Sequence, residues 1–112
     1  MEKVNEESKK VNEETKYRHL TTEFIDFDDN PVKVDIRFKR PGQAICDRAI
    51  KDLSRSPGRA MSNLLMACVH PDDKSALQAA IENFPGVGVA FASEIMERTG
   101  YSAEVVNKLG KQ

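Results

Sequence analysis

Cysteine and histidine are the residue types of this sequence best suited to chemistry. Cys68 and His70 form its one close Cys/His pair, and Cys46 and His19 are the other residues of these types. A structural zinc site usually takes four ligands from two short-spaced pairs, and a nucleophilic cysteine needs a histidine within hydrogen-bond reach. Residues 68 and 70 would point in different directions on a helix, and a second pair is missing. We therefore expect neither a metal site nor a thiol nucleophile, and we interpret both cysteines as core residues.

Paired carboxylates and a glycine-containing stretch do not match known sites either. Asp28 and Asp29 lie in a turn sequence, and Asp72 and Asp73 lie at the expected start of a helix, where caps favour Asp. The ligand spacing of an EF-hand loop is absent, and residues 85–88 (PGVG) lack the pattern of a phosphate-binding loop. The sequence therefore predicts a binding protein without a cofactor rather than an enzyme.

Charge is distributed unevenly along the 112 residues, although the net charge is only −1. Residues 33–59 hold eight Lys/Arg and three Asp/Glu, a net of +5, between two acidic ends. This basic band could face an anionic partner. Nucleic acid is the less favoured partner because the pI is about 6.1 and no helix-turn-helix glycine turn is present. A solvated face or an acidic protein partner is the preferred interpretation. The candidate residues of the basic surface are Arg37, Lys39, Arg40, Arg48, Lys51, Arg55 and Arg59.

The elements that must position these residues begin with a β-hairpin over residues 18–38. Residues 18–27 are rich in Thr, Phe and Ile, which is typical of a strand. Residues 32–38 alternate between apolar and charged types, which predicts a half-buried strand. A hairpin alone is barely stable, so its apolar face must pack on helices. The residues predicted on that face are Val32, Val34, Ile36 and Phe38.

Apolar residues at helical spacing predict short helices after the hairpin. Their expected ranges are 41–54, 57–69, 72–83, 86–98 and 102–109. Proline at a helix start or after a helix end punctuates this part of the chain. The predicted fold class is α+β and mostly helical, with an N-terminal antiparallel β-hairpin followed by four or five short packed helices. We expect one domain over residues 17–112.

A heptad is written twice at the N-terminus, as KVNEESK at 3–9 and KVNEETK at 10–16. A coiled-coil seam needs apolar residues at both the a and the d positions. With Val4 at a, the d position falls on Glu7, and the second copy repeats this mismatch. We therefore interpret residues 1–16 as a flexible polar tail rather than an oligomerising helix. The alternative is a tail that orders on a partner.

A partner surface is predicted near the C-terminal end of the chain. The start of helix 86–98 is apolar nearly all round, which is typical of a central helix or of one that lies under a partner. Contiguous exposed apolar surface often marks an interaction site. An apolar groove between helix 86–98 and residues 101–109 would suit an apolar helix of a client protein or a second copy of this chain. The alternative is that these residues are ordinary core. The candidate residues are Gly88, Ala92, Tyr101, Val105, Val106 and Leu109.

Short motifs that end the predicted strands and helices occur in a recognisable order along residues 32–102. A strand ends in Phe-Lys-x-Pro (38–41), a helix ends in Val-x-Pro (69–71), a Phe-Pro-Gly break follows (84–86), and the next helix ends in Thr-Gly (99–100). This pattern resembles the small tail assembly chaperones of tailed phages and prophages. The resemblance covers about two-thirds of the chain and does not include the heptad repeat.

The resemblance implies a non-catalytic cytoplasmic protein of a bacterial host cell. Such a protein binds the tape measure protein and keeps it soluble until tail tube subunits polymerise around it, so the implied partners are the tape measure protein and the tail tube protein, with self-association as a further expectation. The alternative function is a small cytoplasmic regulator or nucleic-acid-binding accessory protein that uses the basic band 33–59. No run of about 18 apolar residues predicts a membrane span.

Overall fold

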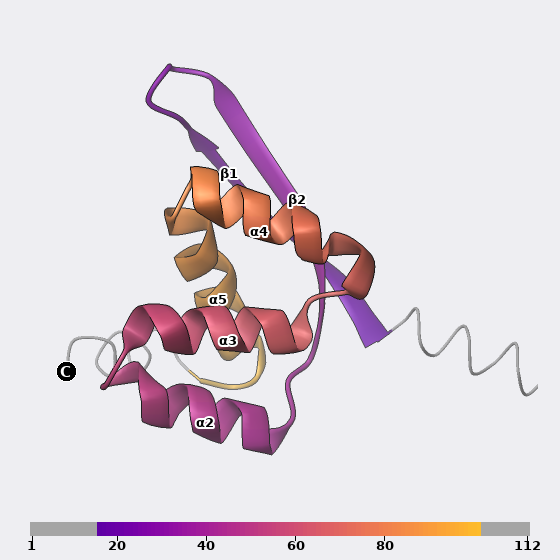
Figure 1. The fold of residues 1–112 in the computed structure, drawn as a ribbon. Helices are drawn as coiled ribbons and strands as arrows, with labels where there is room; N and C mark the ends of the chain where they lie inside the picture. Colours follow the sequence, from indigo (N-terminus) through magenta and orange to yellow (C-terminus); the bar gives the residue numbers. More distant parts are fainter. Residues whose placement is uncertain (1–15, 102–112) are drawn as a thin grey trace, which may run out of the picture.

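The computed structural model describes residues 16–101, which form a hairpin followed by four α-helices (Figure 1). The predicted tail, except Lys16, and the predicted helix 102–109 lie outside the described residues. The observed α+β class and element order confirm the sequence prediction for the described part. The elements are β1 (Tyr17–Ile25), β2 (Pro31–Lys39), α2 (Gln43–Leu53), α3 (Pro57–Cys68), the 3-10 helix η1 (Pro71–Asp73), α4 (Lys74–Asn83) and α5 (Gly86–Arg98).

The hairpin is antiparallel and pairs its strands in register from Tyr17 opposite Lys39 to Ile25 opposite Pro31. Its buried residues lie at the base, where Leu20, Ile36 and Phe38 are each 2–3% exposed. The predicted apolar face of β2 is confirmed, because its apolar side chains alternate with more exposed charged ones. Figure 1 shows that the far half of the hairpin projects beyond the helices.

The turn of the hairpin is built around the Asp26 carboxylate. Asp26 Oδ1 accepts hydrogen bonds from the backbone N–H groups of Asp28 and Asn30, both at 2.9 Å. Backbone bonds from Asp26 to Asn30 and from Asp29 to Asp26 close the same loop, and Asp29 adopts a left-handed φ of 65°. The turn is thus held by its own hydrogen bonds. Phe27, at 108% exposed, packs on nothing in the described chain.

The helices form the core against the base of the hairpin. α2 and α3 lie side by side, and α5 packs between α3 and β1 (Figure 1). Phe91 of α5 and Phe38 of β2 have ring centroids 5.2 Å apart. Other fully buried side chains of this cluster come from α3, α4 and the end of α5, namely Leu65, Leu77 and Met96.

The predicted helix 72–83 is divided in the structure into η1 and α4. His70, rather than an aspartate, caps η1, because its Nδ1 accepts a hydrogen bond of 3.1 Å from the backbone N–H of Asp72. Asp73 occupies the N-cap position of α4, as expected, but its side chain makes no cap hydrogen bond, because its carboxylate is bound to Arg37 of β2. No helix within residues 16–101 is long and apolar enough to cross a membrane.

Candidate functional site

The cysteines and histidines occupy separate structural positions. Cys46 and Cys68 are free and buried, and burial raises the pKa of the Cys68 thiol from 9.0 to about 11. His19 contacts Asp35 at 3.0 Å on the exposed face of the hairpin, far in sequence from His70 at the cap of η1. Within residues 16–101, no group of three or more His, Cys, Asp or Glu side chains could hold a metal ion.

Arg37, the first residue of the predicted basic surface, has a structural role. Its backbone N and its Nε donate to Asp73 Oδ2, both at 2.9 Å, and its Nη2 donates to Oδ1 at 2.8 Å. Hydrogen bonding from the Arg37 side chain lowers the pKa of Asp73 from 3.8 to about 2. Arg37 thus joins β2 to η1 and directs its guanidinium at this chain's own carboxylate.

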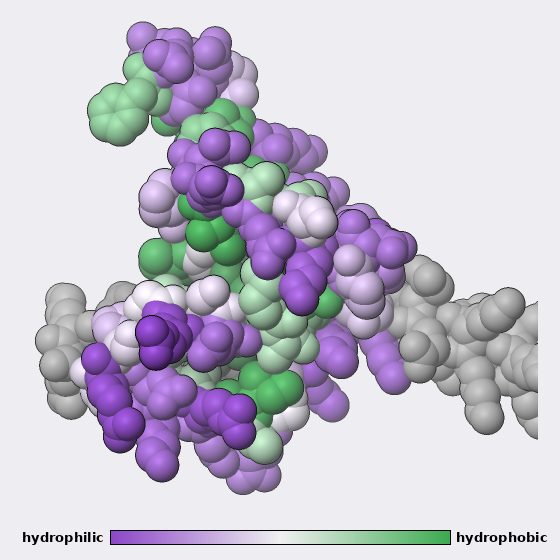
Figure 2. All heavy atoms as spheres, viewed as in Figure 1, coloured by the Kyte–Doolittle hydropathy of each residue, from purple (hydrophilic) through white to green (hydrophobic). Residues whose placement is uncertain are grey.

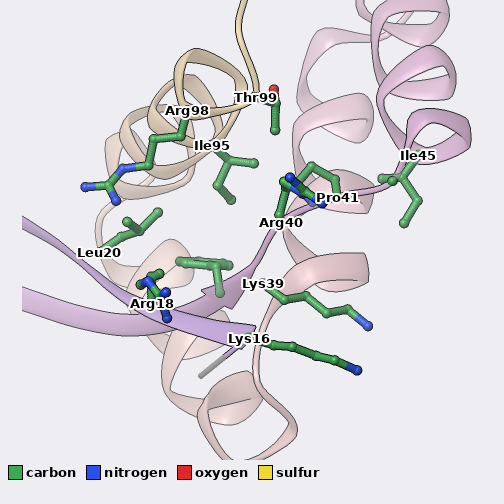
Figure 3. A pocket seen from close by; sticks show the side chains of 12 residues that line it. Lys16, Arg18, Leu20, Lys39, Arg40, Pro41, Ile45, Ile95, Arg98 and Thr99 are labelled. Atoms are coloured by element: carbon green, nitrogen blue, oxygen red, sulfur yellow. The ribbon is translucent and has the colours of Figure 1, made fainter. Parts of the chain in front are cut away.

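Lys39 and Arg40 belong to a groove of about 840 Å³ at the base of the hairpin, which we call the basic groove (Figure 3). Its walls come from β1, the connection between β2 and α2, and the end of α5. Apolar residues of the lining are Leu20, Phe38, Pro41, Ile45 and Ile95. Its cationic residues are Lys16, Arg18, Lys39, Arg40 and Arg98, and no carboxylate lines it. The groove therefore combines apolar walls with positive charge, which suits an acidic partner that carries an apolar side chain.

The remaining predicted basic residues lie elsewhere. Arg48 and Lys51 are exposed on α2, Arg55 follows α2, and Arg59 lies in the first turn of α3. The structure thus divides the predicted basic band into an α2–α3 group and the pair that lines the groove. Sequence reasoning missed Arg18 and Arg98 as groove residues, although the hairpin register, which sets residue 18 opposite residue 38, was a usable signal for the first.

The predicted partner residues on α5 are inside the fold. A Cβ atom at Gly88 would lie 3.6 Å from Ile81 and 3.8 Å from Leu65, and Ala92 is 3% exposed. Helices α4 and α3 of the same chain therefore approach closely at Gly88. Tyr101 is partly buried and packs against the core cluster. Val105, Val106 and Leu109 lie outside the described residues.

A second groove, of about 760 Å³, separates the hairpin tip from the junction of α4 and α5. We call it the apolar notch. Phe24 and Phe84 meet edge to face in its lining, with ring centroids 5.1 Å apart. The lining also includes Ile25 and Phe27, which are 64% and 108% exposed.

Apolar side chains gather near the notch on the face shown in Figure 2, at the hairpin tip and where the hairpin meets the helices. Val89 of α5 is a further exposed apolar residue, at 50%. Sequence reasoning assigned residues 18–27 to a strand and so missed Phe27 as an exposed tip residue. The flanking carboxylates of Asp26 and Asp28 were the available signal, because a phenylalanine between them in a turn has no core to enter.

The fold and these surfaces define a small α+β domain with a projecting hairpin, and its described part carries the basic groove and the apolar notch. The chain belongs to the family described as Domain of unknown function (DUF6848), whose model matches residues 9–108. A similar solved structure is titled "Structure of uncharacterised protein rbstp2171 from bacillus stearothermophilus". It is 28% identical, with a TM-score of 0.66, and the match covers 84% of this chain and 93% of that chain. A comparison with curated proteins gives no match.

Proposed function

We propose that this protein is a non-catalytic chaperone that binds an apolar helical segment of a client protein in the apolar notch. The observation that carries this proposal is the exposure of Ile25 and Phe27, which line a preformed groove. Exposed apolar side chains that cluster on a small domain usually mark an interaction surface. An apolar groove of this kind suits the apolar face of a helix.

The energetics favour this use of the notch. Burying one large apolar side chain contributes about 1.5–3 kcal/mol, and aromatic anchors often dominate binding energies. The Asp26 turn and the contact between Phe24 and Phe84 hold the groove walls before a client arrives. Little ordering is then required on binding, so more of the burial energy appears as affinity.

The client we propose is the tape measure protein of a tailed phage or prophage, with the bacterial cytoplasm as the place of action and the tail tube protein as a further partner. This part rests on the resemblance to tail assembly chaperones. In support, Phe84-Pro85-Gly86, one of the motifs that carry this resemblance, separates α4 from α5 and lines the notch. This motif thus belongs to the proposed binding surface.

The test is co-expression with the proposed client, the tape measure protein of a tailed phage or prophage. Ile25→Glu/Phe27→Glu places two charges at the notch, on side chains that are already exposed. The control is Thr21→Glu/Ala90→Glu, which adds the same charges at exposed positions of β1 and α5 that do not line the notch. We expect both double variants to fold, as judged by circular dichroism and thermal midpoint. Only the notch variant should lose the soluble, co-purifying client, and a notch variant that keeps it would overturn the proposal.

The alternative function, a regulator or nucleic-acid-binding protein that uses residues 33–59, has weaker support. Arg37 is held by Asp73, and the other basic residues form two groups rather than one stripe. Duplex DNA that binds at micromolar concentration, with an affinity that falls steeply as salt rises, would favour this alternative.

A further inference from the structure

We infer that this protein associates with itself head to tail, with the hairpin tip of one copy seated in the basic groove of the next. The tip is residues 23–30, EFIDFDDN. This inference concerns the isolated protein and does not depend on the proposed client. It commits the groove to one occupant, a second copy of this chain.

Charge complementarity is the first argument. The tip carries Glu23, Asp26, Asp28 and Asp29 and no Lys or Arg, a net of −4. The groove lining carries five cationic residues and no carboxylate. Arg98 also lies 3.8 Å from Glu94. In Figure 3, Lys16 and Lys39 extend to one side of the groove and Arg98 to the other, with Arg40 between them. Opposite potentials of this kind steer association and set the orientation of the two copies.

Apolar complementarity is the second argument. Phe27 stands fully in solvent at the centre of the acidic tip. The groove offers apolar walls from Phe38, Ile45 and Ile95 inside its cationic rim. Its volume of about 840 Å³ lies in the range of pockets that accept a ligand larger than one side chain. Phe27 would fill the apolar part while the flanking carboxylates meet the cations.

The shape of the hairpin makes this contact intermolecular. Arg18 of the groove and Phe27 of the tip are nine residues apart along β1 and its turn. At about 3.3 Å per residue, the two sites are about 30 Å apart. The strands between them are paired along their whole length, so the tip cannot return to its own groove. An interface that joins two different surfaces is heterologous, and it continues into rings or filaments.

The test uses two variants that each disable one side of the interface. Phe27→Ala/Asp28→Asn alters the tip, and Lys39→Glu/Arg40→Glu alters the groove. Arg48→Glu/Lys51→Glu is the matched control, with the same charge change on the exposed face of α2. Sedimentation equilibrium measures association at rising protein concentration, at low and high salt (about 0.05 and 0.5 M). Circular dichroism verifies that each variant is folded.

We expect the wild type and the α2 control to associate more strongly at low salt, and the tip and groove variants each to bind at least about tenfold more weakly. A mixture of tip and groove variants should form a 1:1 dimer and nothing larger, because one intact tip and one intact groove remain. A monomeric wild type, or a mixture that does not pair, would overturn the inference. If the tip variant still associates as the wild type does, the tip is not the segment that occupies the groove, and the inference is wrong.

Phe27 also lines the notch, so the tip variant alone cannot separate self-association from client binding. Lys39 and Arg40 line the basic groove and do not line the notch. A groove variant that stays monomeric and still holds the client would leave both proposals standing. Ile25 belongs to the tip as well as to the notch, so the groove variant is the one that distinguishes the two proposals. A groove variant that associates as the wild type does would overturn the self-association alone, whether or not the client is held.

Discussion

Arg37 binds Asp73 through both carboxylate oxygens and through its own backbone N–H. The two residues are 36 positions apart, and they join the C-terminal end of β2 to η1. Beside them, the backbone N–H of His70 donates to the Arg37 carbonyl at 2.9 Å, and Val69 forms a bridge with Phe38. The segment between α3 and α4 therefore docks along the base of the hairpin.

Asp73→Asn should lower the free energy of unfolding by about 1–3 kcal/mol at neutral pH, because a charged acceptor of three hydrogen bonds is lost. The pKa of Asp73 is lower in the folded protein than its ordinary 3.8. The wild-type advantage should therefore be complete above that value and decline as pH falls toward about 2. Urea denaturation of both proteins across this range measures it. Asp72→Asn, whose side chain is 80% exposed, is the control and should change little.

Ile36→Asp should unfold the domain at room temperature. Ile36 is 2% exposed, and an unpaired carboxylate at that site costs several kcal/mol, comparable to the whole stability of a small domain. Ile25→Asp makes the same change in the same hairpin at a position 64% exposed, and it should cost no more than about 0.5 kcal/mol. Circular dichroism and chemical denaturation distinguish the two. Equal stabilities would mean that β2 buries its other face.

Gly88→Ala should be tolerated and should stabilise α5 by up to about 1 kcal/mol, because alanine favours a helix more than glycine does. The added Cβ would make ordinary contacts at 3.6 Å with Ile81. Gly88→Leu should instead destabilise by about 1–3 kcal/mol through overpacking. Gly58→Leu is the control, because nothing lies within 4 Å of a Cβ at that position of α3. Thermal midpoints of the four proteins, wild type included, test this order.

Cys68 should react slowly with a thiol reagent in the native protein. Its side chain is 0% exposed, and its pKa is raised from 9.0 to about 11, so its thiolate fraction near pH 8 falls about 100-fold. The measurement compares labelling rates in buffer and in concentrated urea, in a Cys46→Ala background that leaves one thiol. Equal rates in the two solvents would contradict the observed burial.

Much of the fold follows from short-range patterns in the sequence. The alternation from Val32 to Phe38 identifies the buried face of β2, and the Pro85 break and Gly100 give the observed bounds of α5. Gly100 adopts a φ of 104°, which residues other than glycine rarely do, so its use after a helix is readable in advance.

The binding surfaces are less predictable because they depend on tertiary proximity. The basic groove joins Arg18 near one end of the described chain to Arg98 near the other, and no local pattern links them. The Asp73 carboxylate binds Arg37, which lies 36 residues earlier in the chain. This long-range contact replaces the cap hydrogen bond that the local sequence favours. Helical periodicity also does not indicate that the space beside Gly88 is filled by side chains of α3 and α4.

The hairpin has a buried base and a projecting end, and substitutions in these two parts have different consequences. Substitutions at Leu20, Ile36 or Phe38 act on the core, whereas substitutions between residues 25 and 30 alter a loop held by its own hydrogen bonds. Loop tips of this kind tolerate inserted sequence. Homologues can therefore diverge in recognition at the tip while retaining the same scaffold, and a peptide grafted between Asp28 and Asp29 would be displayed away from the helices.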